Sequence, residues 1–114
     1  MRSDRKRLLD ILEAIDKVDA QSDVERKEFD THELLQVWFV HYLQIIGEAA
    51  SRLSDDFRAR HAEVPWGQLI GMRHILVHGY FEVDLDIVWN AVKNDIVKLK
   101  AQILDIVHSM GNST

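Results

Sequence analysis

The fold is decided by residues 34–53, LLQVWFVHYLQIIGEAASRL, which form the most apolar stretch of the chain. Asp30 or Thr31 suits the N-cap at which a helix through this stretch would begin. A helix that is apolar on most sides is buried on most sides. In so small a domain, we therefore expect one face to pack within the bundle and another to pack against a second copy of the chain.

Before this stretch, a first helix is predicted from about Ser3 to Val18, where apolar residues recur at spacings of three and four. Ser3 or Asp4 can cap its N-terminus, because their side chains accept hydrogen bonds from the first backbone N–H groups. Residues 21–30 are polar and carry both signs of charge. We predict that they form a connection or the frayed end of the first helix.

After the apolar stretch, residues 54–56, Ser-Asp-Asp, offer a stop and a new N-cap. A short turn of helix is predicted over residues 57–61. The next helix opens at residues 64–66, Val-Pro-Trp. Proline is favoured at the first helical position, since its missing N–H would be unpaired there anyway. This helix should falter near Gly79, because glycine weakens helices.

A last helix is predicted after the link over residues 81–83, with Asp84 or Asp86 as its cap. Its apolar residues recur at spacings of three and four, as along the seam of a bundle: Leu85, Val88, Val92, Ile96, Leu99, Ile103, Ile106 and Met110. The predicted fold is all-α, an antiparallel bundle of four main helices plus a short fifth. We expect a single domain over residues 1–114, with a frayed tail at about 111–114.

The chain of 114 residues contains no cysteine, which excludes disulfides and thiolate metal sites and fits a cytoplasmic location. The basic N-terminus, residues 1–7, precedes no uninterrupted apolar run, so neither a secretory signal nor a membrane span is predicted. The formal net charge is −5, whereas proteins that coat nucleic acid are basic, because counterion release supplies their affinity. Contact with RNA would therefore need a local basic patch.

Residues 73–80, RHILVHGY, place an Arg, two His and a Tyr among apolar side chains. Arg73 and Tyr80, seven residues apart, point in nearly the same direction from a helix, and His78 lies about a third of a turn round from Arg73. Arginine binds phosphate in bidentate fashion, and histidine exchanges protons near neutral pH. The pattern suits metal-independent RNA cleavage, in which a base takes the 2′-OH proton and Arg73 stabilises the developing charge. Full acid–base chemistry needs two proton carriers, so one such His per chain suggests a dimer.

The order Arg, four residues, His, one residue and Tyr is also the mark of a known family, and here it is Arg73, His78 and Tyr80. Other stretches that look like the same family are DRKRLLDIL (4–12), IIGEAA (45–50), VPW (64–66) and DLDIVW (84–89). They follow the family order over nearly the whole chain. The protein thus resembles the HepT-like toxins of the HEPN (higher eukaryote and prokaryote nucleotide-binding) superfamily.

The resemblance implies an all-α homodimer in which the two motifs face each other across a cleft. It implies a metal-independent endoribonuclease that acts on RNA without a cofactor. The family's enzymes are toxins paired with a small nucleotidyltransferase antitoxin, which in some relatives transfers AMP onto the motif tyrosine. By this resemblance Arg73 would stabilise the phosphate and the transition state, and His78 would be the general base or acid. Tyr80 would position the substrate and be the target of AMP transfer.

Residues around the motif are expected to support this site: His74, Glu48 and Gly79. Gly79 lets the backbone bend or approach a ligand closely. The chain departs from the family pattern after the motif Arg, where relatives usually carry Asn and this chain carries His74. It also departs before Ile45, where relatives usually carry an Arg near the position of His41. These changes leave the three motif residues in place, but they could alter RNA preference or weaken the nuclease.

Simpler interpretations of the same residues stay open. His74 and His78, four residues apart, share a helix face and could bind a metal, although no HExxH pattern or clear third ligand lies nearby. Arg73 could be the structural ion-pair partner of Glu48, and Tyr80 could be a core aromatic with a hydrogen-bonded tip. The alternative function is a non-catalytic module that binds a nucleotide or docks a nucleotidyltransferase. A plain helical interaction protein is a third interpretation.

Overall fold

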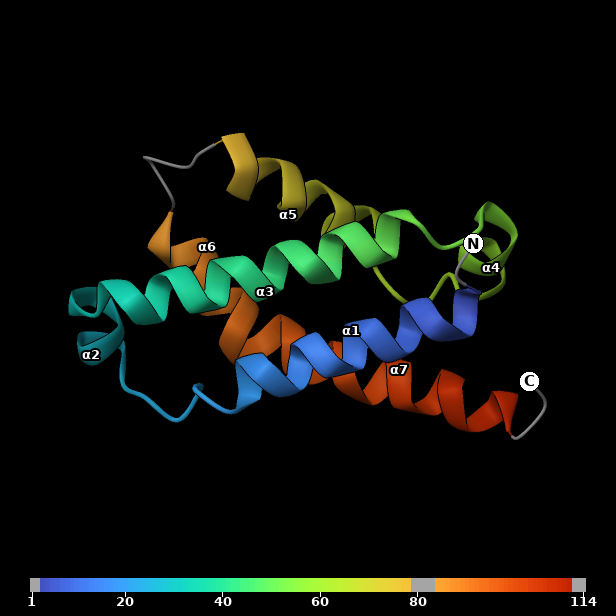
Figure 1. The fold of residues 1–114 in the computed structure, drawn as a ribbon, viewed down its shortest axis with the longest axis horizontal. Coiled ribbons are helices and arrows are strands. Elements are labelled where there is room, and N and C mark those ends of the chain that lie inside the picture. The colour runs from blue at the N-terminus through green and yellow to red at the C-terminus, as the bar shows by residue number, and fades with distance from the viewer. Residues whose placement is uncertain (1–2, 79–83, 112–114) are drawn as a thin grey trace.

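The computed structural model describes the backbone of residues 3–78 and 84–111, and the side chains of all of these except residues 73–78. Every regular element within those ranges is a helix, which confirms the predicted all-α fold (Figure 1). The elements in chain order are α1 (Asp4–Asp19), α2 (Arg26–Thr31), α3 (Glu33–Ser51), α4 (Asp55–Arg60), α5 (Trp66–His78), α6 (Leu85–Asn90), the π-helical segment η1 (Ala91–Asp95) and α7 (Ile96–Met110).

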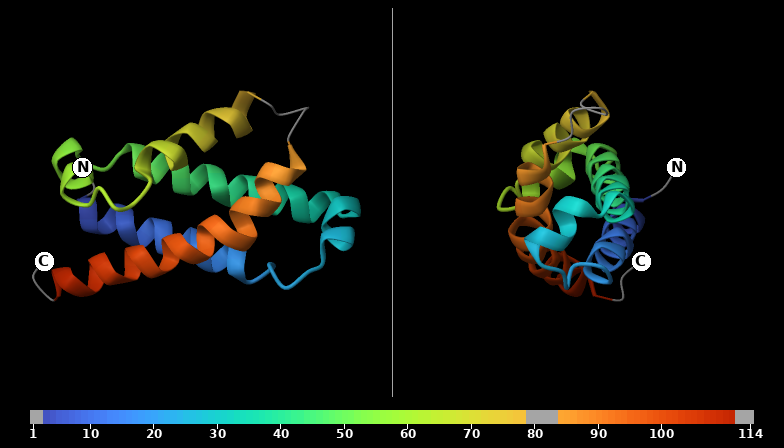
Figure 2. Two further views of the ribbon diagram at one scale, coloured as in Figure 1. Left: turned by 180° about the vertical axis from the view of Figure 1, so that it is seen from behind. Right: turned by 90° about the vertical axis from the view of Figure 1, so that its left-hand side faces the viewer.

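The long helices form the predicted antiparallel bundle. α3 runs through its middle and packs against both α1 and α5. α6, η1 and α7 follow one another without a break and cross over α3 and α1 on the side that the left view of Figure 2 shows in front. The start of α1 and the end of α7 lie at one end of the bundle, whereas α2 and the start of α6 lie at the other. The end of α5 therefore lies on the α2 side of the molecule, next to the start of α6.

The core is built from one face of each long helix. On α3, Leu35, Phe39, Leu43 and Ile46 recur at spacings of three and four and are all buried. α1 and α7 contribute the stripes predicted from their periodicity: Leu8, Ile11, Ile15 and Val18 with Ile96, Leu99, Ile103 and Ile106. No polar side chain is buried among the residues whose side chains are described. Burial of apolar surface is therefore the main stabilising contribution to this fold.

Several helices begin at the capping residues expected from the sequence. The Ser3 side chain accepts a hydrogen bond from the Lys6 N–H, and Asp84 caps α6. Ser54 caps α4, which confirms the predicted short helix but starts it at Asp55, two residues earlier than expected. The Ser54 hydroxyl also donates to Asp4 Oδ2 at 2.8 Å. This contact joins the starts of α1 and α4, which are 50 residues apart in the sequence.

The connection predicted over residues 21–30 is wrong in its second half, where α2 forms. α2 is only six residues long, and its one buried residue is Phe29. A single apolar residue makes no periodic pattern, so its sequence resembles a polar loop. Because α2 extends to Thr31, α3 is capped by His32 rather than by Asp30 or Thr31. The His32 Nδ1 atom accepts a hydrogen bond from the Leu35 N–H at 3.1 Å.

The predicted last helix is continuous, but its middle is π-helical. The backbone N–H of Ile96, the residue after η1, donates to the carbonyl of Ala91, five residues earlier. This bond spans one residue more than an α-helical bond, so the helix is locally wider. The seam residues on either side, including Val92 and Ile96, stay buried. Apolar periodicity therefore predicted the burial correctly and missed the change in winding.

Large apolar side chains that face solvent occur on three of the described helices. Leu34 and Val37 on α3 are 78% and 59% exposed, and Val97 and Leu104 on α7 are 60% and 47% exposed. Ile87 on α6 is 38% exposed. Within the parts of the chain that are described, no helix has the length and apolar character needed to cross a bilayer. The exposed apolar residues are thus features of individual helix faces.

Candidate functional site

α5 carries the first part of the Arg–His–Tyr motif. Arg73, His74 and His78 lie within this helix, and their side chains are outside the described residues. Gly79 and Tyr80 also lie outside the described residues. Because Arg73 and His78 are five residues apart in an α-helix, they are about 140° apart around its axis and about 7.5 Å apart along it. The backbone positions of the two residues therefore lie on different sides of the helix.

The first half of α5 is firmly anchored. The Pro65 carbonyl accepts a hydrogen bond from the Leu69 N–H at 3.1 Å, so Pro65 precedes the first helical residue instead of occupying it. Trp66 is buried, and its indole Nε1 donates to the His61 carbonyl at 2.9 Å. Leu69 and Met72 are buried one and two turns further on. The motif thus follows directly on a helix face that is fixed in the core.

Glu48 lies on α3, the helix that packs against α5. Its Oε1 atom accepts a hydrogen bond from Arg52 Nε at 2.8 Å, one turn further along the same helix. Whether Glu48 also contacts Arg73 depends on a side chain outside the described residues. The expected support of Arg73 by Glu48 therefore stays a prediction.

A groove of about 500 Å³ opens between α1 and α3, and we call it the α1–α3 groove. Six of its ten lining residues are polar or charged: Arg7, Asp10, Glu13, His41, Gln44 and Glu48. His41 is exposed, and its ring meets Tyr42 edge-on with the centroids 4.8 Å apart. His41 thus lies on the outer surface of α3 in the same groove as Glu48.

A second groove, of about 510 Å³, opens between α5 and the α6–η1 segment, and we call it the α5–α6 groove. It is lined by Gln68, Gly71, Met72, Asp86, Ile87, Asn90 and Asp95. Met72 is the residue immediately before Arg73, so this groove borders the motif. No sequence pattern predicts this groove, because its two walls come from distant segments that meet only in the folded chain.

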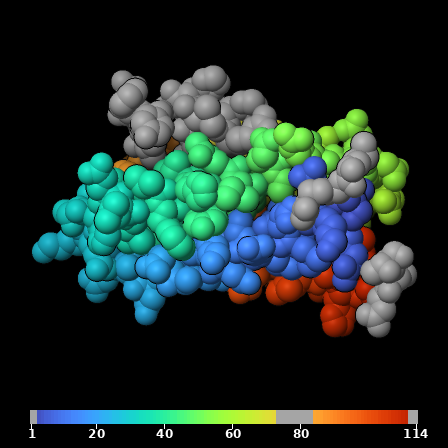
Figure 3. Space-filling view, viewed as in Figure 1, coloured from blue at the N-terminus to red at the C-terminus, as the bar shows by residue number. Residues whose placement is uncertain are grey.

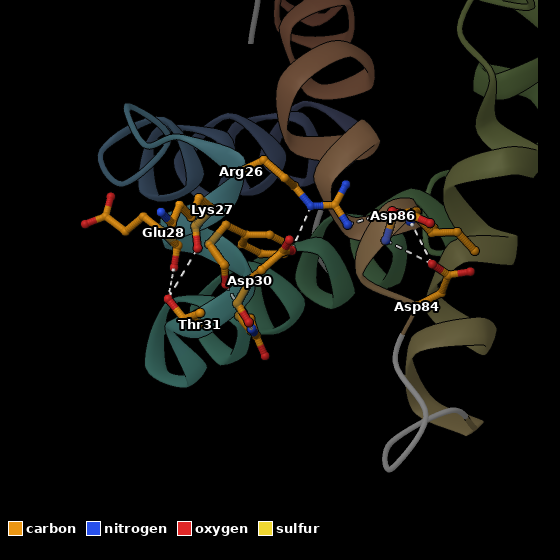
Figure 4. A network of polar contacts seen from close by, with 10 residues as sticks. Arg26, Lys27, Glu28, Asp30, Thr31, Asp84 and Asp86 are labelled. Carbon is orange, nitrogen blue, oxygen red and sulfur yellow. Dashed lines mark hydrogen bonds and ion pairs between the residues drawn. The ribbon is translucent and has the colours of Figure 1, made fainter.

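Arg26 fastens α2 to the start of α6 (Figure 4). Its Nε donates to Asp30 Oδ1 at 2.7 Å, and its Nη2 donates to Asp86 Oδ1 at 2.6 Å. These hydrogen bonds, with Asp30 first and Asp86 second, raise the pKa of Arg26 above its ordinary value. The guanidinium also lies 5.8 Å from the centroid of the Trp89 ring. The spacing of four residues predicts the contact of Arg26 with Asp30. No local pattern predicts its contact with Asp86, which is 60 residues away.

The described residues give no metal centre. Within residues 3–72 and 84–111, no group of three or more His, Asp or Glu side chains is arranged to hold an ion. The pair His74 and His78, which could bind a metal by its spacing, has side chains outside the described residues.

An all-α bundle with the Arg–His–Tyr motif at the end of a core helix is the arrangement expected of a HEPN protein. The family model described as "Ribonuclease HepT-like" matches residues 11–106. The chain therefore belongs to the HepT-like ribonuclease family of the HEPN superfamily. Membership confirms the predicted family and an enzyme of the ribonuclease class. No solved structure matches the chain.

Relatives with similar sequences include proteins of two archaea. A Thermococcus cleftensis protein named "Probable ribonuclease HepT" is 36% identical over 102 residues, which are 89% of this chain and 93% of the relative. A Methanocaldococcus jannaschii protein named "Putative RNase" is 37% identical over 97 residues, 84% of this chain and 89% of the relative. Another protein of that organism, named "Gamma-glutamylcyclotransferase and putative RNase", is 39% identical over 112 residues, 96% of this chain and half of the relative.

Proposed function

We propose that the protein is a metal-independent endoribonuclease and the toxin of a toxin–antitoxin pair. The observation that carries this proposal is the family match over residues 11–106, which includes the whole Arg–His–Tyr motif. The names of the relatives from Thermococcus cleftensis and Methanocaldococcus jannaschii support the ribonuclease activity. The active site would consist of Arg73 and His78 from each of two copies.

In the proposed reaction, the imidazole of one His78 removes the proton from a ribose 2′-OH. The 2′ oxygen attacks the adjacent phosphorus, and Arg73 stabilises the negative charge that develops on the phosphoryl oxygens. The bond from phosphorus to the 5′ oxygen then breaks, and the protonated His78 of the second copy gives that oxygen its proton. The products are a 2′,3′-cyclic phosphate and a 5′-OH end. Tyr80 would hold the RNA in register.

The outer face of α3 supports a homodimer as the active form. Leu34 and Val37 are the two most exposed apolar residues of this helix, and His41 continues the same face one turn on. α3 occupies the middle of the molecular face in Figure 3. α3 and α5 pack against each other and run antiparallel, so the motif end of α5 is directed toward the end of the molecule where Leu34 and Val37 lie. A second copy bound there would bring its own motif close.

The proposed antitoxin is a nucleotidyltransferase that adds AMP to Tyr80. AMP transfer would place a phosphate on Tyr80, seven residues after Arg73 in the motif. This phosphate would occupy the guanidinium and repel the phosphate of an incoming RNA. Gly79 would let the partner's active site approach the backbone, and His74 would line the same surface.

The decisive test is cleavage of a labelled single-stranded RNA by the purified protein in excess EDTA. The wild type should generate fragments with cyclic phosphate ends, and His78→Ala should be slower by about 10²–10⁴-fold, as for loss of a general acid–base group. His108→Ala, an exposed histidine of α7, is the matched control and should keep full activity. Binding of AMP or ATP without any cleavage would overturn the proposal and favour the non-catalytic nucleotide-binding module.

The toxin role is tested separately. Induced expression of the wild type should arrest growth, and co-expression of a nucleotidyltransferase encoded beside it should restore growth together with a mass increase of AMP on Tyr80. Unchanged growth on expression of an active nuclease would exclude the toxin role while leaving the enzymatic activity intact.

A further inference from the structure

We propose that the α5–α6 groove is a nucleobase subsite that selects guanine in the RNA substrate. The inference rests on the proposed function, because it assigns a recognition site to the same ribonuclease. Gln68 and Met72 line the groove on α5, and Arg73 follows Met72 directly. From Gln68 to Arg73 the helix rises about 7.5 Å, so the groove begins within one nucleotide of the phosphate that Arg73 would bind.

The groove has the size and floor that a base requires. Its volume of about 510 Å³ lies in the range of small-molecule sites. The side chains of Met72 and Ile87 supply apolar contact from its two walls. Between them, Gly71 leaves the α5 backbone bare, and a Cβ added there would meet no atom within 4 Å. A planar base can therefore approach the helix at Gly71 more closely than at a residue with a side chain.

The polar groups of the groove match the Watson–Crick edge of guanine. The Asp95 side chain makes no hydrogen bond or ion pair with another described residue, so its carboxylate is available to accept. Guanine presents two adjacent N–H donors, N1–H and the N2 amino group, to which one carboxylate can bind in bidentate fashion. Adenine, cytosine and uracil each present at most one donor beside an acceptor that a carboxylate repels. Asp95 therefore favours guanine over the other three bases.

The amide side chains complete the match. Asn90 Oδ1 accepts from Asn94 Nδ2 at 2.7 Å, which leaves the Asn90 amide N–H groups to donate to the guanine O6 atom. Gln68 offers a second amide from the opposite wall. The other carboxylate of the groove, Asp86, is held by Arg26 at 2.6 Å, so its charge is compensated. The groove thus combines one open carboxylate with amide donors instead of being a plain acidic cluster.

The π-helical segment gives this arrangement a structural cause. In an α-helix, Asn90 and Asp95 would lie about 140° apart, and they would face different surroundings. In η1 the hydrogen bond spans five residues, which turns residues five apart toward the same side. Both Asn90 and Asp95 line the groove as a result. Single π-helical turns occur frequently at functional sites, which is an independent reason to expect a ligand here.

The test compares RNAs of equal length that carry G, inosine, A, C or U at one variable position beside the cleaved bond. The wild type should show a kcat/KM for G about tenfold above that for inosine, which lacks only the N2 amino group, as expected for a bidentate contact. Asp95→Asn should abolish the difference between G and inosine. Retention of the wild-type G preference in Asp95→Asn would overturn the inference.

A steric variant checks the same groove without touching its polar groups. Gly71→Leu should lower kcat/KM on the G substrate at least tenfold, because the new side chain fills the space where the base lies. Gly67→Leu is the matched control, one turn earlier on α5, where an added Cβ also meets nothing within 4 Å and the residue lines neither described groove. It should stay within twofold of the wild type. Equal activity of both variants would overturn the inference.

A binding measurement separates failure of this inference from failure of the proposed function. GMP and AMP are titrated into wild-type protein and Gly71→Leu in EDTA by calorimetry. Cleavage without G preference, together with equal binding of GMP and AMP, leaves the ribonuclease standing and refutes the guanine subsite. No cleavage, together with GMP binding that Gly71→Leu weakens at least tenfold, refutes the ribonuclease and supports the subsite.

Discussion

The two faces of α3 differ in a way that separates folding from assembly. On its inner face Phe39 and Leu43 are no more than 2% exposed, whereas on its outer face Leu34 and Val37 are 78% and 59% exposed. The inner face is apolar along the helix and closes the monomer core, whereas the outer face is apolar at Leu34 and Val37 and continues with polar residues such as His41. Apolar side chains left in water forgo about 25 cal/mol for every Å² that could be buried. The outer face is therefore where association with a second copy would gain most.

The largest loss of stability is expected for a substitution on the inner face of α3. Phe39→Ala should lower the free energy of unfolding by about 3–5 kcal/mol, because it removes a buried ring and leaves a cavity beside Phe29, whose ring centroid is 5.9 Å away. Urea unfolding followed by circular dichroism measures the loss. Val97→Ala on α7 is the control, since Val97 is 60% exposed, and it should change stability by no more than about 0.5 kcal/mol. Equal effects of the two variants would contradict the inner-face assignment.

A charge on the outer face of α3 should disrupt association of two copies without unfolding the monomer. Leu34→Glu places a carboxylate in the first turn of α3, where the helix dipole favours negative charge, so the monomer should stay folded. The dimer should dissociate at micromolar concentration in sedimentation experiments, and RNA cleavage should fall at least tenfold, because a lone motif lacks its second proton carrier. Leu104→Glu on α7 is the matched control, at 47% exposure, and should remain dimeric and active. A dimeric and active Leu34→Glu protein would remove α3 from the interface.

Local signals in the sequence predicted much of the fold. α1 and α7 follow from apolar periodicity, α3 from its long apolar stretch and α5 from its Val-Pro-Trp opening. Ser3 and Ser54 were identified as caps because capping depends on residues three apart. α2 was missed, because its only buried residue, Phe29, is fixed by rings from distant segments, with Trp89 at 5.3 Å. The winding of η1 was missed for a related reason: it leaves the apolar pattern unchanged.

The sequence predicts the motif residues of the candidate site, but it does not predict the groove beside them. Arg73 and His78 were assigned to a helix that the structure confirms, whereas the roles of their side chains stay predictions. The α5–α6 groove could not be foreseen, because Gln68 and Asp95 are 27 residues apart and meet only after the bundle closes. The Arg26 contact with Asp86 has the same origin. Contacts between residues within one helical turn can be predicted from the sequence, whereas contacts between residues on different helices cannot.

A smaller effect is expected where the fold is held by a cap. Ser54→Ala removes the acceptor for the Phe57 N–H at 3.1 Å and the donor to Asp4 Oδ2. It should lower the free energy of unfolding by about 1 kcal/mol, the usual cost of a lost N-cap, and leave the dimer and cleavage unchanged. Ser109→Ala, near the end of α7, loses only a contact to its own helix and should be nearly neutral. A cap variant that changed the dimer constant would contradict the separation of fold from assembly.

The smallest change in stability is expected at the ion pair between Arg52 and Glu48 on the outer face of α3. Arg52→Ala breaks the exposed ion pair with Glu48, in which the two side chains are 57% and 44% exposed, and should cost only about 0.3 kcal/mol. RNA cleavage should stay within twofold, because Arg52 has no proposed role in the reaction. Glu48→Gln removes the same ion pair, but it should also slow cleavage severalfold if Glu48 supports Arg73 as proposed. Stability would then change in both variants, whereas activity would change only in Glu48→Gln. Equal activity in both would reduce Glu48 to a surface ion-pair partner and leave Arg73 without support from α3.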